Sequence, residues 1–168
     1  MRLQWMTIAI IGLNFLTYII FNLLGAGAEQ ANNFAILAFG HIPSVSNDIH
    51  SLPGVYQIIP SDLYALTALT SAFMHADIWH LGGNMLFIWV FGDNVEDALG
   101  HIKFLIFYLA CAYAAAWFHA FVFPMSDAPL VGASGAAAGI VAAYLMLHPK
   151  MKSNYSATLF LLPLGATI

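Results

Sequence analysis

The stretch Val131-Gly132-Ala133-Ser134-Gly135-Ala136-Ala137-Ala138-Gly139 opens an apolar segment that continues to Leu147. Its first half is built from glycine, alanine and serine, so it offers little bulk to lipid and lets neighbouring helices approach its backbone closely. We therefore predict a central helix over residues 134–147, surrounded by other helices. The residues before it, 124–130, contain two prolines and form a loop rather than the strand that a nucleophile elbow requires. Ser134 then stands at the start of a helix, where backbone N–H groups are free and the helix dipole is positive.

The composition of the whole chain indicates a membrane protein. Of its 168 residues, 61% are hydrophobic and only 7% are charged, whereas a soluble domain carries about 25% charged residues. A surface this apolar needs lipid as its solvent. The net charge of −4 and only four basic residues argue against a nucleic-acid partner. Cys111 is the single cysteine, so the chain has no intramolecular disulfide. Its cysteine content therefore does not indicate whether the protein resides in an oxidising or a reducing compartment.

Five apolar segments recur at lengths typical of membrane spans. We expect spans at residues 5–24, 79–92, 104–123, 134–147 and, in part, 157–168. The first segment also resembles a secretory signal with a cleavage site near residues 26–28. At about 20 residues it exceeds the usual signal core of about 7–15 residues, so a retained span is favoured. The sequence predicts an all-α, polytopic transmembrane helical bundle.

The basic residues predict the orientation of these spans. Arg2, Lys103, Lys150 and Lys152 all fall on one side of the spans as drawn, which the positive-inside rule makes cytoplasmic. The N-terminus is then cytoplasmic, and residues 25–63 form a long outer connection. A connection of that length is expected to have a function or to contact the membrane interface. Residues 1–168 are predicted to form a single domain that is incomplete at its C-terminus.

His80 and Asn84 are the polar pair of the second span. Their spacing of four residues places them on one helix face, and polar side chains in a span face the protein interior or a water-filled cavity. Both can donate a hydrogen bond to a developing oxyanion. The alternative for this pair is interhelical hydrogen bonding, and the alternative for Ser134 is helix packing. Their presence in one chain favours a catalytic role.

Other polar residues have less certain roles. If the helix extends back to His75, this residue lies about 140° around it from His80, which argues against a paired histidine zinc site. The remaining histidines are scattered, and no metal site is expected. His119 is predicted to be a buried, hydrogen-bonded structural histidine. Glu96 falls after the second span, where we expect it to accept hydrogen bonds in a turn or to cap the third span.

These residues together resemble the rhomboid family of intramembrane serine proteases. The resemblance extends from about Leu63 to Pro149. It rests on four groups of residues: Phe73-Met74-His75 with His80-Leu81-Gly82-Gly83-Asn84-Met85; the run Phe91-Gly92-Asp93-Asn94-Val95-Glu96; Gly100 and Tyr108; and Val131 to Ala136. Their order and spacing are specific, whereas Gly-Ala-Ser-Gly alone is not. The chain looks like a bacterial form with six spans, which implies an integral, multi-pass protein of the bacterial inner membrane.

The resemblance implies a role for each matching residue. Ser134 would be the nucleophile, and His80, Asn84 and the backbone N–H groups of Ala133 and Ser134 would form the oxyanion hole. A set of structural residues would support the site: Gly132, Gly135, Glu96 and Gly100. The Glu96 stretch would brace the inner ends of spans two and three, and the outer connection would partly enter the outer leaflet. The substrates would be transmembrane proteins cleaved in or beside their spans, within the lipid bilayer, and no cofactor is implied.

One departure concerns the general base. In the family it is a histidine on the sixth span, and residues 1–168 contain no counterpart. A serine without a base is a poor nucleophile. We therefore expect a fragment of a longer protease that is inactive, or nearly so, as it stands. The alternatives are a non-proteolytic rhomboid-like protein that binds membrane clients, and a transporter or another helical bundle.

Overall fold

The computed structural model of this chain describes residues 4–22 and 28–148, which are helical apart from short connections. The one strand-like pairing within these ranges is an isolated bridge between His41 and Leu130. In chain order the helices are α1 (Trp5–Asn22), α2 (Ala28–Phe39), α3 (Pro43–Ser46), η1 (Gly54–Tyr56), η2 (Ser61–Leu66), α4 (Thr67–Thr70), η3 (Ser71–Phe73), α5 (Ile78–Leu99), α6 (His101–Val122) and α7 (Ser134–Leu147). The predicted all-α class is confirmed.

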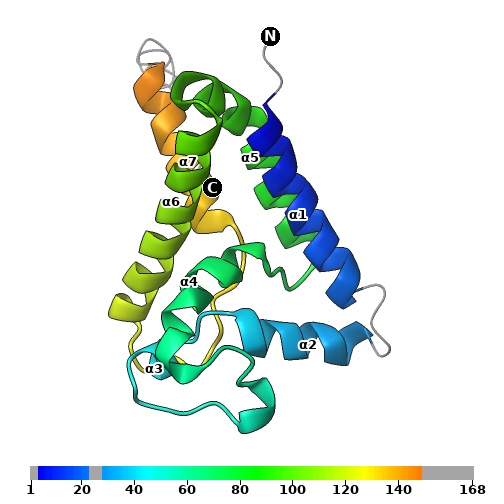
Figure 1. The fold of residues 1–168 in the computed structure, drawn as a ribbon, viewed down its shortest axis with the longest axis vertical. Coiled ribbons are helices and arrows are strands. Elements are labelled where there is room, and N and C mark those ends of the chain that lie inside the picture. Colours follow the sequence, from blue (N-terminus) through cyan, green and yellow to red (C-terminus); the bar gives the residue numbers. More distant parts are fainter. Residues whose placement is uncertain (1–3, 23–27, 149–168) are drawn as a thin grey trace, which may run out of the picture.

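Four long helices form the bundle, and they correspond to the first four predicted spans (Figure 1). By length and apolar composition, α1 and α6 could each cross a membrane, and α7 is a shorter apolar helix. The bounds of α7 are those predicted for the fourth span. The predicted fifth span, residues 157–168, lies outside the described residues.

The helix of the predicted second span, α5, is longer than predicted. The expected span ended at residue 92, before the acidic residues, but α5 continues to Leu99 and contains Glu96. Glu96 is buried, and its carboxylate accepts hydrogen bonds from Met6 N–H (2.9 Å), Thr7 N–H (2.7 Å) and the Thr7 hydroxyl (2.7 Å), and contacts His101 Nδ1. The first N–H groups of a helix have no partner within it, so a carboxylate at the start of α1 satisfies them. Glu96 thus joins α5 to α1, which was not predicted, and through His101 also to the start of α6, the predicted third span.

Gly100 separates α5 from α6. Its φ of +81° lies in the region that favours glycine, and its N–H donates to Glu96 O at 2.7 Å. The chain therefore turns sharply at this residue, and α6 begins at His101. The predicted structural role of Gly100 is that of this turn.

Glycines allow α7 to lie against α6, as the small-residue pattern predicted. A Cβ atom added at Gly135 would collide with Ala115, and one added at Gly139 would collide with Cys111 Sγ. On the buried side of α7, Ala136, Ala137 and Ile140 join the core with Tyr108 of α6. The segment is thus the central helix that its composition indicated.

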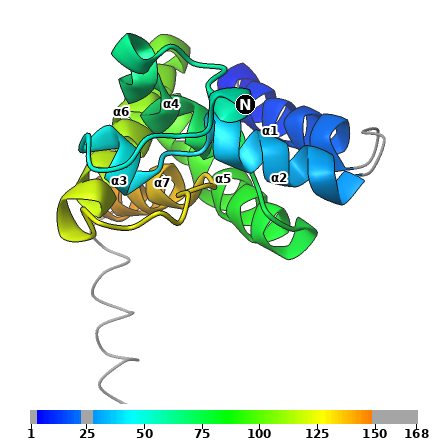
Figure 2. The same ribbon diagram turned by 90° about the horizontal axis from the view of Figure 1, so that it is seen from below.

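The outer connection is more structured than a loop over residues 25–63. It contains α2, and Figures 1 and 2 show α2, α3 and α4 gathered near one end of the bundle. The segment that follows α6 is tied to this region by the paired backbone bonds between His41 and Leu130 (3.1 and 2.9 Å) and by Ser44 N–H to Ser126 O (3.0 Å). It then returns into the bundle, so that α7 starts deeper than the end of α6 (Figure 1).

The orientation remains a prediction. Lys103 lies in the first turn of α6, at the same end of the bundle as the start of α1 (Figure 1). The other three basic residues, Arg2, Lys150 and Lys152, lie outside the described residues.

Candidate active site

The site is built around the start of α5. Asp77 is the N-cap, and its carboxylate accepts hydrogen bonds from Trp79 N–H (2.9 Å) and His80 N–H (2.8 Å). A capping carboxylate fixes where a helix begins, so it fixes the position of His80 in the first turn. Asn84 follows one turn later and is 7% exposed. The predicted helical spacing of His80 and Asn84 is therefore confirmed.

Gly132 brings the other half of the site to these two residues. Its N–H donates to Ser71 O at 2.8 Å, and its φ is +109°. A Cβ atom at this position would lie 2.6 Å from His80 Cε1 and Nε2, and 3.4 Å from Asn84 Nδ2. His80 and Asn84 therefore lie against the glycine that precedes Ala133 and Ser134, and no larger residue fits there.

Ser134 is the first residue of α7 and is exposed. It opens onto a groove between α5 and α7 with a volume of about 460 Å³. The groove is lined by Asn84, Phe87, Ser134, Ala137, Ala138, Val141, Ala142 and Leu145. Ser134 and Asn84 are the two polar residues in this lining. The candidate nucleophile and a candidate oxyanion donor thus share one apolar groove.

His75 lies beside His80 in the site, a position that its spacing in the sequence did not indicate. Its ring centroid lies 5.2 Å from that of His80. The expected separation around a helix was wrong because α5 begins at Ile78, so that His75 lies in the preceding segment and folds back beside His80. The acidic cap at Asp77 was the available signal, since a capping residue marks the helix start.

His75 is buried and makes two contacts within the site. Its Nε2 lies 3.0 Å from Asn84 Nδ2 and 3.4 Å from Ala133 N, whose N–H donates to it. Burial, and secondarily the neighbouring His80, lower the pKa of His75 to about 4. A neutral imidazole with an unprotonated Nε2 is therefore the form present at neutral pH.

The remaining predicted residues lie around this centre. The Ala133 N–H faces His75, so its predicted role as an oxyanion donor stays a prediction. Glu96 follows His80 by sixteen helical positions in α5, which is about 24 Å along the helix axis, and it supports the bundle rather than the site. His119 is half-buried beside Phe123, at a ring distance of 5.2 Å. Its Nδ1 has no hydrogen-bond partner among the described residues, so the predicted hydrogen bond is absent at that nitrogen.

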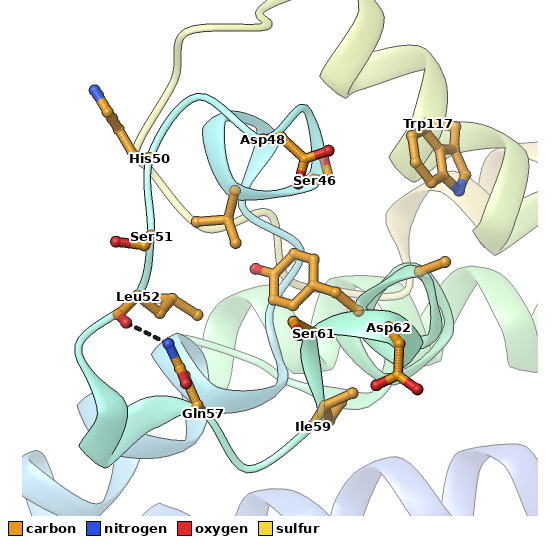
Figure 3. Close-up of a pocket in the computed structure, with 13 residues that line it drawn as sticks. Ser46, Asp48, His50, Ser51, Leu52, Gln57, Ile59, Ser61, Asp62 and Trp117 are labelled. Carbon is orange, nitrogen blue, oxygen red and sulfur yellow. Dashed lines mark hydrogen bonds between the residues drawn. The ribbon is translucent and has the colours of Figure 1, made fainter.

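A second cavity, of about 310 Å³, lies in the outer connection (Figure 3). Its lining includes Asp48, His50, Asp62 and Trp117. Figure 3 shows the His50 ring and the Asp62 carboxylate pointing away from one another. Because its charged groups do not converge, this cavity does not form a second reactive centre.

Comparison with known proteins adds an independent line of support. A family model described as Rhomboid domain matches residues 62–167, which is more than half of the chain. This range contains every residue of the site described above. No solved structure matches the chain.

Several curated proteins are similar to this chain. Rhomboid protein 1, mitochondrial, of Saccharomyces cerevisiae is 32% identical over 103 residues, covering 58% of this chain and 30% of that protein. RHOMBOID-like protein 12, mitochondrial, of Arabidopsis thaliana is 34% identical over 111 residues, covering 56% and 31%. Inactive rhomboid protein 1 of Drosophila melanogaster is 31% identical over 114 residues, covering 68% of this chain and 8% of that protein.

The chain thus spans less than a third of the length of these three relatives. Two of their names place those proteins in mitochondria, and the name of a fourth relative, Rhomboid-like protein 11, chloroplastic, of Arabidopsis thaliana, places it in chloroplasts. These names give no support to the bacterial inner membrane predicted above. The domain match and the helical bundle together show that the chain belongs to the rhomboid family of membrane-integral proteins.

Proposed function

We propose that this chain is the site-bearing part of an intramembrane serine endopeptidase, with Ser134 as its nucleophile. The observation that supports this most directly is the meeting of His80, Asn84 and Gly132 immediately before Ser134. Polar groups from helices far apart in sequence gather at the start of a central helix. Around them the bundle is apolar, and Ser134 opens onto the groove that it shares with Asn84.

The proposed chemistry is acyl transfer to the Ser134 hydroxyl. Oγ attacks the carbonyl carbon of a substrate peptide bond, and the carbonyl oxygen becomes an oxyanion. His80, Asn84 and the free N–H at the start of α7 donate to that oxyanion. The tetrahedral intermediate collapses with loss of the amine, and water then hydrolyses the acyl-enzyme. A general base takes the Oγ proton and delivers it to the nitrogen of the leaving amine. We place this base, as in the family, on a histidine of a sixth span beyond residues 1–168.

The groove suggests the class of substrate. Six of its eight lining residues are apolar, which suits an apolar segment rather than a charged peptide. We therefore propose transmembrane or juxtamembrane segments of membrane proteins as substrates, encountered within the lipid bilayer. Because the chain covers about 30% of its organellar relatives, this activity is proposed for the whole protein.

The test is cleavage of a helical membrane substrate by the protein expressed from its complete reading frame. Ser134→Ala should abolish cleavage without changing the thermal midpoint, because Ser134 is exposed and its hydroxyl supports no packing. Ser126→Ala is the matched control, since Ser126 lies in the loop before α7 and its hydroxyl accepts a hydrogen bond from Ala128 N–H of the same loop. Unchanged cleavage by Ser134→Ala would reject the proposal.

One comparison favours a second candidate, a rhomboid-like protein that binds membrane clients without cleaving them. The chain is 31% identical to a Drosophila protein named as inactive. A fluorophosphonate probe separates the two functions, because it bonds covalently only to an activated serine. Labelling lost in Ser134→Ala supports the peptidase. Absence of labelling in the complete protein, with clients still co-purifying, supports the binding protein.

A further inference from the structure

We propose that His75 is a positioning residue of the site: it accepts hydrogen bonds from Asn84 and from Ala133, and thereby fixes which atoms of Asn84 face the reacting carbonyl. This inference deepens the proposed peptidase function and rests on it. His75 lies in the segment before α5, whereas Ala133 precedes α7. Its ring therefore links the two halves of the site.

The backbone contact fixes the tautomer of His75. A peptide N–H can only donate, and the N–H of Ala133 points at Nε2. Nε2 must therefore be unprotonated, and the ring proton resides on Nδ1. His75 is 3% exposed, so water does not compete freely for Nε2. Protonation of Nε2 would place a hydrogen against two donors and is correspondingly opposed.

The tautomer in turn fixes the amide of Asn84. An asparagine amide can face a neighbour with its oxygen or its NH₂ group, and only the hydrogen-bond network decides which. Because Nε2 is an acceptor, Asn84 must present Nδ2–H to it, as the 3.0 Å contact has it. The same Nδ2 lies next to Gly132, 3.4 Å from the position of a Cβ there. The second hydrogen of Asn84 Nδ2 is then free to donate towards the substrate carbonyl.

Without His75, this orientation would lose its determinant. An apolar residue at position 75 would let the Asn84 amide flip, which would turn its carbonyl oxygen towards the developing oxyanion. It would also leave the buried N–H of Ala133 without a partner. Loss of one oxyanion donor lowers kcat by about 10²–10³-fold, so an effect of that size on kcat, and little on KM, is expected.

Two substitutions at position 75 distinguish the hydrogen-bonding role of His75 from the effect of its side-chain volume. His75→Leu keeps the volume but cannot accept a hydrogen bond, and His75→Gln keeps an acceptor in its amide oxygen. In the complete protein we expect His75→Leu to lower kcat by about 10²–10³-fold with KM within about 2-fold, and His75→Gln to recover most of the lost kcat. His41→Leu is the control, because His41 is equally buried and its Nδ1 bonds Thr67 instead.

A spectroscopic measurement on this chain tests the geometry without any turnover. With ¹⁵N-labelled histidine and asparagine, we expect the His75 Nε2 resonance to be that of an unprotonated acceptor at pH 7. The NH₂ resonances of Asn84 should shift in His75→Leu and return towards the parent position in His75→Gln. A protonated Nε2, or Asn84 resonances unmoved in His75→Leu, would overturn the inference.

The failures of the two proposals are distinguishable. If Ser134→Ala abolishes cleavage while His75→Leu retains the parent kcat, the peptidase stands and the positioning role is wrong. If Ser134→Ala leaves cleavage unchanged, the peptidase is wrong, and the Asn84 resonances alone decide the hydrogen-bond geometry. Equal losses of kcat in His75→Leu and His41→Leu would show a general effect of buried histidines and reject positioning.

Discussion

At the scale of single residues, Gly132 sets the dimensions of the site. Its positive φ and the closeness of His80 exclude a side chain for two independent reasons. The backbone before Ser134 can therefore approach α5 closely. In the proposed reaction, this proximity brings one serine hydroxyl and two donor side chains to the same carbonyl group.

We predict that Gly132→Ala moves the backbone before Ser134 away from His80 and Asn84 of α5. The added Cβ would lie 2.6 Å from the His80 ring, and the backbone strain adds about 1–2 kcal/mol. A displacement of about 1 Å costs about 10²-fold in rate, so cleavage by the complete protein should fall by that order. Gly12→Ala is the control, because a Cβ at the exposed Gly12 meets nothing within 4 Å. Equal activity in both variants would contradict the role of Gly132.

A second prediction concerns the Asn84 side chain. Asn84→Ala should lower kcat by about 10²–10³-fold with little change in KM, because its N–H is needed mainly when the oxyanion forms. Steady-state kinetics on the complete protein provide the measurement. Asn94→Ala, at an exposed position in the same helix, should match the parent. A raised KM at constant kcat would show that Asn84 binds substrate instead.

The helix positions of His80, Asn84 and Ser134 could be predicted because they follow from local patterns. A spacing of four residues defines a helix face, and a serine after a proline-containing loop defines a helix start. His75 could not be placed in this way, since its position depends on where α5 begins and on how the preceding segment folds back. Contacts such as that between His75 and Ala133 join residues 58 positions apart and have no periodic signature.

At the scale of helices, one carboxylate determines how α1 and α5 pack. Glu96 is 1% exposed, and its oxygens accept hydrogen bonds from two N–H groups and one hydroxyl of α1. A single side chain thus satisfies the free N–H groups at the start of a helix. The sequence predicted that Glu96 lies on the inner side of the membrane. It did not indicate that the hydrogen-bond partners of Glu96 belong to the first span.

We predict that Glu96→Ala weakens the bundle. Two N–H groups of α1 would lose their acceptor, at about 1–3 kcal/mol for each group, which lowers the thermal midpoint by about 4–24 °C in a chain of this size. Thermal unfolding in detergent measures the shift. Asp97→Ala, at the exposed neighbouring position, should leave the midpoint unchanged. Equal midpoints for the two variants would argue that Glu96 stabilises nothing.

Helix bounds were predictable where composition changes sharply and not elsewhere. The segment 134–147 is bordered by a loop with prolines and by His148-Pro149, and α7 has those bounds. The end of α5 was misplaced because acidic residues were taken to mark water, although Glu96 is satisfied inside the protein. The helix α2 was not predicted because its polar first turns resemble a loop.

At the scale of the whole molecule, the bundle has two different ends. One end holds the start of α1, the end of α5 and Lys103 at the start of α6. The other holds the outer connection, which lies at the end of the bundle where α1 ends and α5 begins (Figures 1 and 2). His41 is fully buried in this connection and bonded to Thr67 through Nδ1 at 2.8 Å.

His41 and His75 together predict how stability depends on pH. Burial, and secondarily a neighbouring histidine, lower the pKa of each to about 4 from 6.5. Between these values the unfolded state binds more protons than the folded state, so stability rises with pH across this window. It is complete above pH 6.5 and declines as the pH falls towards 4, by up to about 3 kcal/mol for each histidine.

Thermal midpoints measured from pH 7 to pH 4 test this linkage. The parent chain should lose stability steadily through the window, whereas His41→Gln should show a shallower decline because one of the two groups no longer titrates. His148→Gln, at a half-buried ring beyond α7, should retain the parent slope. If the parent and His41→Gln decline in parallel, protonation of His41 does not oppose folding, and water reaches the His41 ring within the outer connection.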